Sequence, residues 1–181
     1  KKVLSELWVS NEINLAGINF ENHCVLSGTL PGLKQAESIL KKERIASQML
    51  PVKIAFHSHY MESAYNAFIA GFHALNVKAF QTPVYSALKN KYLETADITP
   101  KLFWDFTRQT IDFENCIKTL EKQNNDSSQW FYIDCGPSGT LANFVKNIMH
   151  EPTRTQIICS PFGKELENLQ KVLEARAIYQ K

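Results

Sequence analysis

The stretch Leu50–Ala64, with the sequence LPVKIAFHSHYMESA, decides our interpretation of the fold. Its residues Val52–Phe56 are strand formers and a helical pattern of apolar residues follows, so we predict that His57 ends a strand and precedes a helix. A rigid strand that holds an imidazole at the rim of a fold is a common support for a general base. The alternative that spacing alone favours is a histidine in a surface turn.

The elements before His57 predict an incomplete ferredoxin-like small subdomain over residues 1–56. The expected order is helix, strand, strand, helix, strand, which is a split β-α-β unit that lacks its first strand. The predicted elements are a helix at Lys2–Val9, strands at Asn14–Asn19 and His23–Ser27, a helix from Pro31 to Arg44 and a strand at Gln48–Phe56.

Residues 57–181 alternate between predicted strands and helices, which indicates an α/β fold with a parallel sheet. The stretch Lys89–Pro100 is polar enough to form a loop. The expected strands are Thr82–Ala87, Trp130–Asp134 and Gln156–Ser160. The expected helices are one with apolar Ala64, Phe68, Phe72 and Leu75, followed by Pro100–Phe106, Phe113–Leu120, Leu141–Met149 and Lys164–Ala177.

Composition argues against several kinds of partner. The 181 residues carry a net charge of +2 with basic and acidic residues mixed along the chain, so we expect no nucleic-acid partner. No stretch approaches the roughly 18 apolar residues of a membrane helix, and the N-terminus lacks a signal-peptide pattern, so we expect no membrane association and a cytoplasmic location. The cysteines form no C-x-x-C motif and are predicted to be reduced core residues: Cys24, Cys116, Cys135 and Cys159.

Three kinds of chemistry compete for His57. A metal site of His57 and His59, with His73 as a third candidate ligand, is disfavoured because His57 and His59 would point to opposite faces of a strand and no H-E-x-x-H motif or Cys/His cluster accompanies them. We expect neither a metal nor a bound cofactor. A phosphate loop at Gly136–Thr140 lacks the ending of a Walker A motif, and a structural turn with a positive φ at Gly136 explains it equally well. The third is a histidine base for a nucleophile, but Ser138 has no nucleophile elbow, so the nucleophile would lie outside this sequence.

Three segments resemble the later part of an acyltransferase domain of the malonyl-CoA:acyl carrier protein transacylase family, as in polyketide and fatty-acid synthesis. They are Ala16–Gly28 (AGINFENHCVLSG), Leu50–Ala64 and Tyr132–Phe144 (YIDCGPSGTLANF), and their order and spacing also agree with the family. The resemblance implies a ferredoxin-like subdomain packed on an α/β-hydrolase-like core, of which residues 57–181 would be the C-terminal part. It also accounts for the missing first strand.

The resemblance implies roles for four residues. His57 would be the catalytic histidine that activates a serine, and Phe56 would screen the α-substituent of the acyl group. Asn19 would border the acyl pocket, with a turn asparagine at a strand end as the alternative. A backbone carbonyl near Phe106 would orient the imidazole. The motif that starts at Ile54 resembles the H-A-F-H form linked with malonyl preference, although Ile54 departs from it.

The sequence also departs from the family at its functional motifs. It has no G-Q-G oxyanion loop, no G-H-S-x-G elbow and no carboxylate-binding arginine, so we expect an N-terminal half with the serine on the same or another chain. Gly136–Leu141, Phe103-Trp104 and Ser160–Gly163 resemble the acyl hydrolases of trans-acyltransferase polyketide pathways. The implied function is ping-pong acyl transfer from a carrier protein or coenzyme A, preferably as a hydrolase that removes stalled acyl groups. The alternatives are a malonyl transacylase and an inactive carrier-protein-binding module.

Overall fold

The computed structural model describes residues 12–72, 78–123, 130–160 and 162–179. The predicted helix Lys2–Val9 lies outside this range, as does Leu75. The chain forms two compact units, residues 1–18 with 23–112 and residues 19–22 with 113–181. The subdomain boundary predicted after residue 56 falls within the first unit and stays a prediction.

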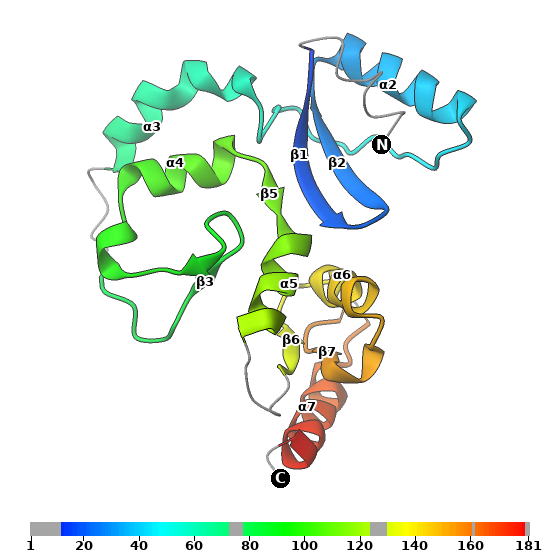
Figure 1. Cartoon of the computed structure of the whole chain (residues 1–181), viewed down its shortest axis with the longest axis vertical. Helices are drawn as coiled ribbons and strands as arrows, with labels where there is room; N and C mark the ends of the chain where they lie inside the picture. Colours follow the sequence, from blue (N-terminus) through cyan, green and yellow to red (C-terminus); the bar gives the residue numbers. More distant parts are fainter. Residues whose placement is uncertain (1–11, 73–77, 124–129, 161, 180–181) are drawn as a thin grey trace. The chain divides into compact units, whose positions relative to one another are not determined.

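The first unit begins with a β-hairpin and a helix, as the sequence predicts. β1 (Ile13–Phe20) and β2 (His23–Gly28) are hydrogen-bonded neighbours joined by two residues, and α2 (Leu30–Lys42) follows directly (Figure 1). Thr29 caps α2 by accepting the Gly32 N–H at 3.1 Å, and Pro31 occupies the first turn, where its missing N–H costs nothing. One core cluster joins the hairpin to the helix through Ile13, Leu26, Leu33, Ala36, Ile39 and Leu40.

The predicted strand Gln48–Phe56 does not form, and this prediction is wrong. Residues 45–58 contain no helix or strand. The next elements are η1 (His59–Ala64), α3 (Tyr65–Phe72), the antiparallel pair β3 (Tyr85–Ser86) and β4 (Lys91–Tyr92), η2 (Thr95–Asp97), α4 (Pro100–Arg108) and β5 (Ile111–Asp112). β5 pairs in parallel with β1 and completes a three-stranded sheet of order β2-β1-β5. The loop predicted at Lys89–Pro100 therefore contains two short elements.

Aromatic packing joins α3 to α4. The Trp104 ring lies edge-on to the rings of Tyr65 and Phe68, at centroid distances of 5.2 and 5.5 Å, and Phe72 packs on Phe103 at 5.0 Å. The apolar pattern in the sequence correctly predicts both helices because these residues recur on one helical face.

The second unit is a β-α-β arrangement with flanking helices. Its elements are α5 (Phe113–Gln123), β6 (Tyr132–Asp134), α6 (Thr140–Met149), η3 (Pro152–Arg154), β7 (Thr155–Ile157) and α7 (Glu165–Tyr179). β6 and β7 pair in parallel with Asp134 opposite Ile157, and α6 connects them (Figure 1). The apolar core combines α5 and α6 through Ile117, Val145 and Ile148. The predicted α/β class is thus confirmed.

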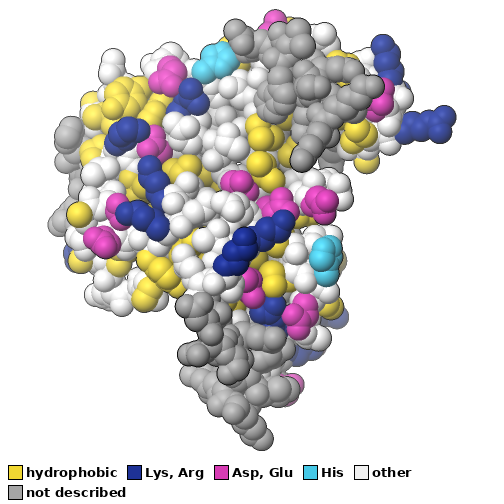
Figure 2. Space-filling model, in the orientation of Figure 1, with side chains coloured by type: hydrophobic (Ala, Val, Ile, Leu, Met, Phe, Trp, Pro, Cys, Tyr) yellow, Lys and Arg dark blue, Asp and Glu magenta, His cyan; other side chains and the backbone are white. Residues whose placement is uncertain are grey.

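The surface charges and the burial of the cysteines can be compared with what the composition predicts. Basic and acidic side chains are interspersed on the face shown in Figure 2. No helix among the described residues is long and apolar enough to cross a membrane. All four cysteines lie in the described part of the chain and form no disulfide there, but only Cys116 is buried, so the prediction of four core cysteines is wrong.

Candidate active site

The segment that leads to His57 has a strand-like sequence, but it pairs with no other strand among the described residues. Val52 and Ile54 are 58% and 56% exposed, and Phe56 is exposed as well. The amides of Val52 and Phe56 bond only two residues back, to the carbonyls of Leu50 and Ile54. Strand formers need a neighbouring strand to satisfy their backbone groups, and among the described residues none pairs with this segment.

His57 therefore lies in a turn instead of at a strand end. Its φ is 59°, in the left-handed region that a residue with a Cβ seldom adopts. Ser58 follows and is fully buried; its Oγ donates to the Ala55 carbonyl at 2.5 Å and accepts the Tyr60 N–H at 3.3 Å. Ser58 is thus the N-cap of η1, a role that the serine before a helical pattern could have indicated.

Two backbone carbonyls at the end of α4 hold His57. The His57 N–H donates to the carbonyl of Thr107 at 2.7 Å, and the ring Nδ1 lies 2.8 Å from the carbonyl oxygen of Gln109. A carbonyl oxygen only accepts hydrogen bonds, so Nδ1 carries the proton in the neutral ring. Nε2 then has a free lone pair, and the imidazole is arranged to accept a proton at Nε2.

The carbonyl expected near Phe106 is corrected to that of Gln109. The predicted helix ended at Phe106, whereas α4 continues to Arg108 and Gln109 is its C-cap. The last carbonyls of a helix lack partners within the helix, so several at this end could contact the histidine, and the ring Nδ1 lies beside that of Gln109. The sequence analysis missed Thr107 and Gln109 because it ended the helix two residues early.

His59 has a different environment from His57. Its Nδ1 lies 3.3 Å from the Asn14 side-chain oxygen, and its ring stacks near Tyr60 at a centroid distance of 4.1 Å. The two histidines thus contact different elements. Among the described residues no group of three or more potential ligands could hold a metal ion.

The structure leaves the other predicted site residues undecided. Phe56 immediately precedes His57 and is exposed. Asn19 lies in β1 within a segment assigned to the second compact unit. Their roles at an acyl pocket stay predictions.

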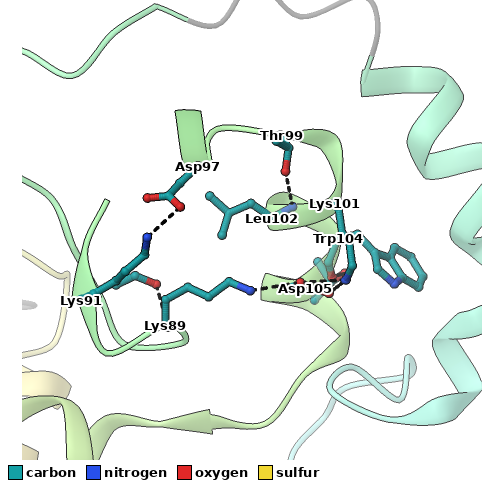
Figure 3. Close-up of polar contacts among 10 residues, drawn as sticks. Lys89, Lys91, Asp97, Thr99, Lys101, Leu102, Trp104 and Asp105 are labelled. Carbon is teal, nitrogen blue, oxygen red and sulfur yellow. Dashed lines mark hydrogen bonds and ion pairs between the residues drawn. The ribbon is translucent and has the colours of Figure 1, made fainter. Parts of the chain in front are cut away.

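A buried carboxylate anchors α4. Asp105 is only 5% exposed and accepts hydrogen bonds from Lys101 Nζ at 2.8 and 3.0 Å and from Lys89 Nζ at 3.4 Å (Figure 3). Burial alone would raise the pKa of Asp105, but the two lysines outweigh it and lower the pKa below its usual value. At the start of the same helix, Thr99 caps the Leu102 N–H at 3.1 Å. The helix that presents the two carbonyls is therefore fixed at several points.

The loop Gly136–Thr140 in the second unit is organised by Asp134, which the sequence analysis missed. The Asp134 carboxylate accepts the N–H groups of Gly136 and Ala142 at 2.8 and 2.9 Å. The positive φ occurs at Gly139 (66°) instead of Gly136, so that expectation is wrong. A Cβ on Gly139 would also lie 2.7 Å from the Ile157 side chain. These contacts explain the glycine turn without a phosphate.

Solved acyltransferases have the fold of this chain. The acyltransferase domain from module 8 of the salinomycin polyketide synthase matches with a TM-score of 0.83 at 17% identity, covering 96% of this chain and 41% of that chain. The malonyl CoA-acyl carrier protein transacylase from Clostridium perfringens matches with a TM-score of 0.78 at 22% identity, covering 99% and 55%. The fold class is therefore that of the acyltransferases.

Curated proteins extend the likeness to the sequence, although no family model matches the chain. The polyketide biosynthesis acyltransferase homolog PksD of Bacillus subtilis is 34% identical over 160 residues, which cover 87% of this chain and 48% of PksD. The malonyl CoA-acyl carrier protein transacylase of the same organism is 30% identical over 141 residues, covering 76% and 43%. The chain is homologous to this acyltransferase family. It spans about half the length of the curated relatives it matches.

Proposed function

We propose that the complete protein carries out acyl-thioester chemistry on acyl carrier proteins in polyketide biosynthesis, with His57 as the general base of a serine nucleophile. The observation that carries the proposal is the hydrogen bond between His57 Nδ1 and the Gln109 carbonyl, because it leaves Nε2 as the proton acceptor. The names of the homologous proteins support the substrate class.

The chemistry follows from the arrangement of the imidazole. Nε2 takes the proton of a serine hydroxyl as its oxygen attacks the thioester carbonyl, and the imidazolium returns that proton to the leaving thiol of phosphopantetheine or coenzyme A. The Gln109 carbonyl stabilises the imidazolium through its partial negative charge, as a carboxylate does in a triad. Because the 181 residues contain no G-H-S-x-G elbow, the proposal assigns the serine to an N-terminal half on the same or another chain, which is then a required partner.

We favour hydrolysis of the acyl-enzyme over transfer to a second thiol. Water competes with a dilute carrier thiol for the ester of the acyl-enzyme. A transferase must protect this ester from water, whereas an enzyme that removes stalled acyl groups need not. The resemblance of the Gly136–Leu141 loop to acyl hydrolases supports this choice. No metal or cofactor is required, and phosphopantetheine and coenzyme A act as acyl donors.

A malonyl transacylase is the second candidate. Phe56 beside His57 and the 30% identity to a malonyl CoA-acyl carrier protein transacylase favour it. A carrier-protein-binding module without activity is the third candidate and requires that the upstream serine be absent.

One experiment separates these functions. The complete protein is incubated with acetylated or propionylated carrier protein, or with malonyl-CoA and free carrier, and mass spectrometry follows the phosphopantetheine arm. The proposal expects multiple turnovers of free-acid release and poor malonyl loading, with His57→Ala as the blank. Rapid malonyl loading with negligible deacylation would establish the transacylase, and no acyl-enzyme with any donor would favour the binding module.

A further inference from the structure

Three consecutive residues at the end of α4 contact the short segment from His57 to Glu62. The carbonyls of Thr107 and Gln109 bond the backbone and the ring of His57. Between them, Arg108 Nε donates to Glu62 Oε1 at 2.6 Å. Of these three contacts, only the Arg108–Glu62 ion pair uses a side chain from the end of α4, and the other two use backbone carbonyls.

The Gln109 carbonyl depends on contacts on both sides of it. Gln109 lies beyond the helix with an extended backbone, φ −88° and ψ 155°, so the helical hydrogen bonds do not fix the direction of its carbonyl. The preceding residue, Arg108, is held by Glu62, and the following residue, Thr110, donates its hydroxyl to the Leu15 carbonyl at 2.6 Å. Of these two contacts, only the ion pair joins Gln109's neighbour to the histidine-bearing segment itself.

His57 requires this support because its conformation is strained. A left-handed histidine persists only where the surrounding contacts hold it, and a small displacement of the ring is costly for proton transfer. Glu62 lies in η1, immediately after the turn of His57 and Ser58. A contact at Glu62 therefore holds the short helix that follows the turn, while the two carbonyls hold His57 itself.

We propose that Arg108 and Glu62 form a positioning pair that keeps the His57 imidazole aligned on the Gln109 carbonyl. The inference rests on the proposed function, because it assigns the pair to the orientation of the catalytic base. The Arg108 side chain is 23% exposed and that of Glu62 is 57% exposed, so the pair contributes little to global stability. Its effect is on the position of the ring.

The test uses the complete protein with Arg108→Gln, Glu62→Gln, the double variant and Arg108→Lys. The control is Glu114→Gln, which breaks an ion pair of the same 2.6 Å length, Lys118 to Glu114, within α5 of the other unit. Two readouts are taken. Nuclear magnetic resonance of ¹⁵N-histidine at about pH 8.5, above the ordinary histidine pKa, reports which ring nitrogen of His57 carries the proton. Stopped-flow acylation reports kcat and KM.

The wild-type ring is expected to show the proton on Nδ1. In both single variants the two nitrogen signals of His57 should move toward each other as the tautomers mix, and kcat for acylation should fall about 10-fold with KM nearly unchanged. The double variant should lose no more than either single variant, because both changes remove one interaction. Arg108→Lys should keep most of the wild-type signal and rate, and Glu114→Gln should match the wild type in both.

Unchanged ring signals in Arg108→Gln and Glu62→Gln would overturn the positioning pair, as would losses that multiply in the double variant. Failure of the proposed function is recognised separately. A wild-type protein that forms no acyl-enzyme contradicts the acyl chemistry, while the ring signals still show whether the pair positions the imidazole.

Discussion

His57 combines a left-handed backbone with a ring whose Nδ1 is already committed to a carbonyl oxygen. Both features restrict the residue, and the contact of Nδ1 leaves Nε2 as the ring nitrogen that can accept a proton. His59, two residues away, instead has its Nδ1 3.3 Å from the side-chain oxygen of Asn14. At the scale of single residues, the difference between the two histidines is therefore a difference in hydrogen-bond partners.

We predict that His57→Ala lowers the rate of acyl-enzyme formation by about 10³-fold or more, the scale of loss when the base of a nucleophile is removed. His59→Ala is the matched control and should cost far less. The measurement is burst kinetics with an acyl thioester on the complete enzyme. Equal losses in the two variants would show that His57 is not the base.

Ser138 tests whether the nucleophile lies elsewhere. Its hydroxyl shares a 2.7 Å hydrogen bond with that of Thr140 in the Gly136–Thr140 loop. We predict that Ser138→Ala leaves the acyl-enzyme intact, because this loop supports the fold and carries no base contact to the serine hydroxyl among the described residues. Intact-protein mass spectrometry decides the matter, and loss of the acyl mass in Ser138→Ala would place the nucleophile on this loop.

The same loop contains a glycine, Gly139, at which any side chain should destabilise the fold. Gly139→Ala places a Cβ at φ 66° and against Ile157, so we expect a loss of about 1–3 kcal/mol in the free energy of unfolding. Gly71→Ala is the control, because Gly71 lies in α3 with nothing within 4 Å of its Cβ position and should gain about 0.5–1 kcal/mol. Urea denaturation measures both, and a stabilised Gly139→Ala protein would contradict the turn.

At the scale of secondary structure, α4 connects the stability of the first unit to the position of His57. Its N-terminus is capped by Thr99 and its centre is fixed by Asp105 and two lysines (Figure 3). Its C-terminal end presents the carbonyls of Thr107 and Gln109 to His57. The charge on Asp105 makes this anchoring depend on pH.

We predict that the Asp105 carboxylate stabilises the protein above the ordinary aspartate pKa of about 3.9 and that this stability is lost as the pH falls through the lower folded pKa. Asp105→Asn should reduce stability at pH 7 by about 1–3 kcal/mol, since it removes hydrogen bonds to a charged group. The free energy of unfolding of this variant should also depend less on pH in the acid range. Denaturant unfolding at a series of pH values measures both effects.

The control for this prediction is Asp97→Asn, the same substitution in the more exposed ion pair with Lys91. High salt should abolish most of the effect of Asp97→Asn, because exposed charges are screened, but should leave most of the effect of Asp105→Asn. If both effects vanish in salt, the anchoring of α4 by a buried charge is disproved.

At the scale of the whole molecule, the segment before His57 is strand-like in sequence but pairs with no strand among the described residues. Its apolar side chains alternate along a strand-like sequence and are exposed. Since the homologous proteins are about twice as long, we predict that the complete protein pairs this segment with a further strand. Slow amide exchange at residues 50–56 in the complete protein is the expected observation.

A pair of substitutions tests which face that strand would bury. In the complete protein Ile54→Ala should destabilise by about 2–5 kcal/mol, as for a core residue, although Ile54 is exposed here. Lys53→Ala, on the opposite face of a strand, should change stability by less than about 0.5 kcal/mol. Equal small effects of the two changes would mean that the segment stays outside the core.

The sequence by itself determined the elements whose signals are local. The helices α2, α4, α5 and α6 follow from apolar periodicity and, for α2, from Pro31 near its start, and these signals require no distant partner. The likeness of three segments to acyltransferases, which the homologous proteins confirm, also follows from the order of residues alone. His57 is singled out by that same likeness.

Only the tertiary structure decided which groups hold the imidazole. Gln109 lies 52 residues from His57 in the chain, and its carbonyl is available because α4 ends at Arg108, two residues later than predicted. The predicted strand Gln48–Phe56 does not form for the converse reason, because residues with strand propensity form a strand only when another strand satisfies their backbone groups. Helices close their hydrogen bonds within a few residues, whereas strands and the carbonyls beyond helix ends find partners that local sequence does not specify.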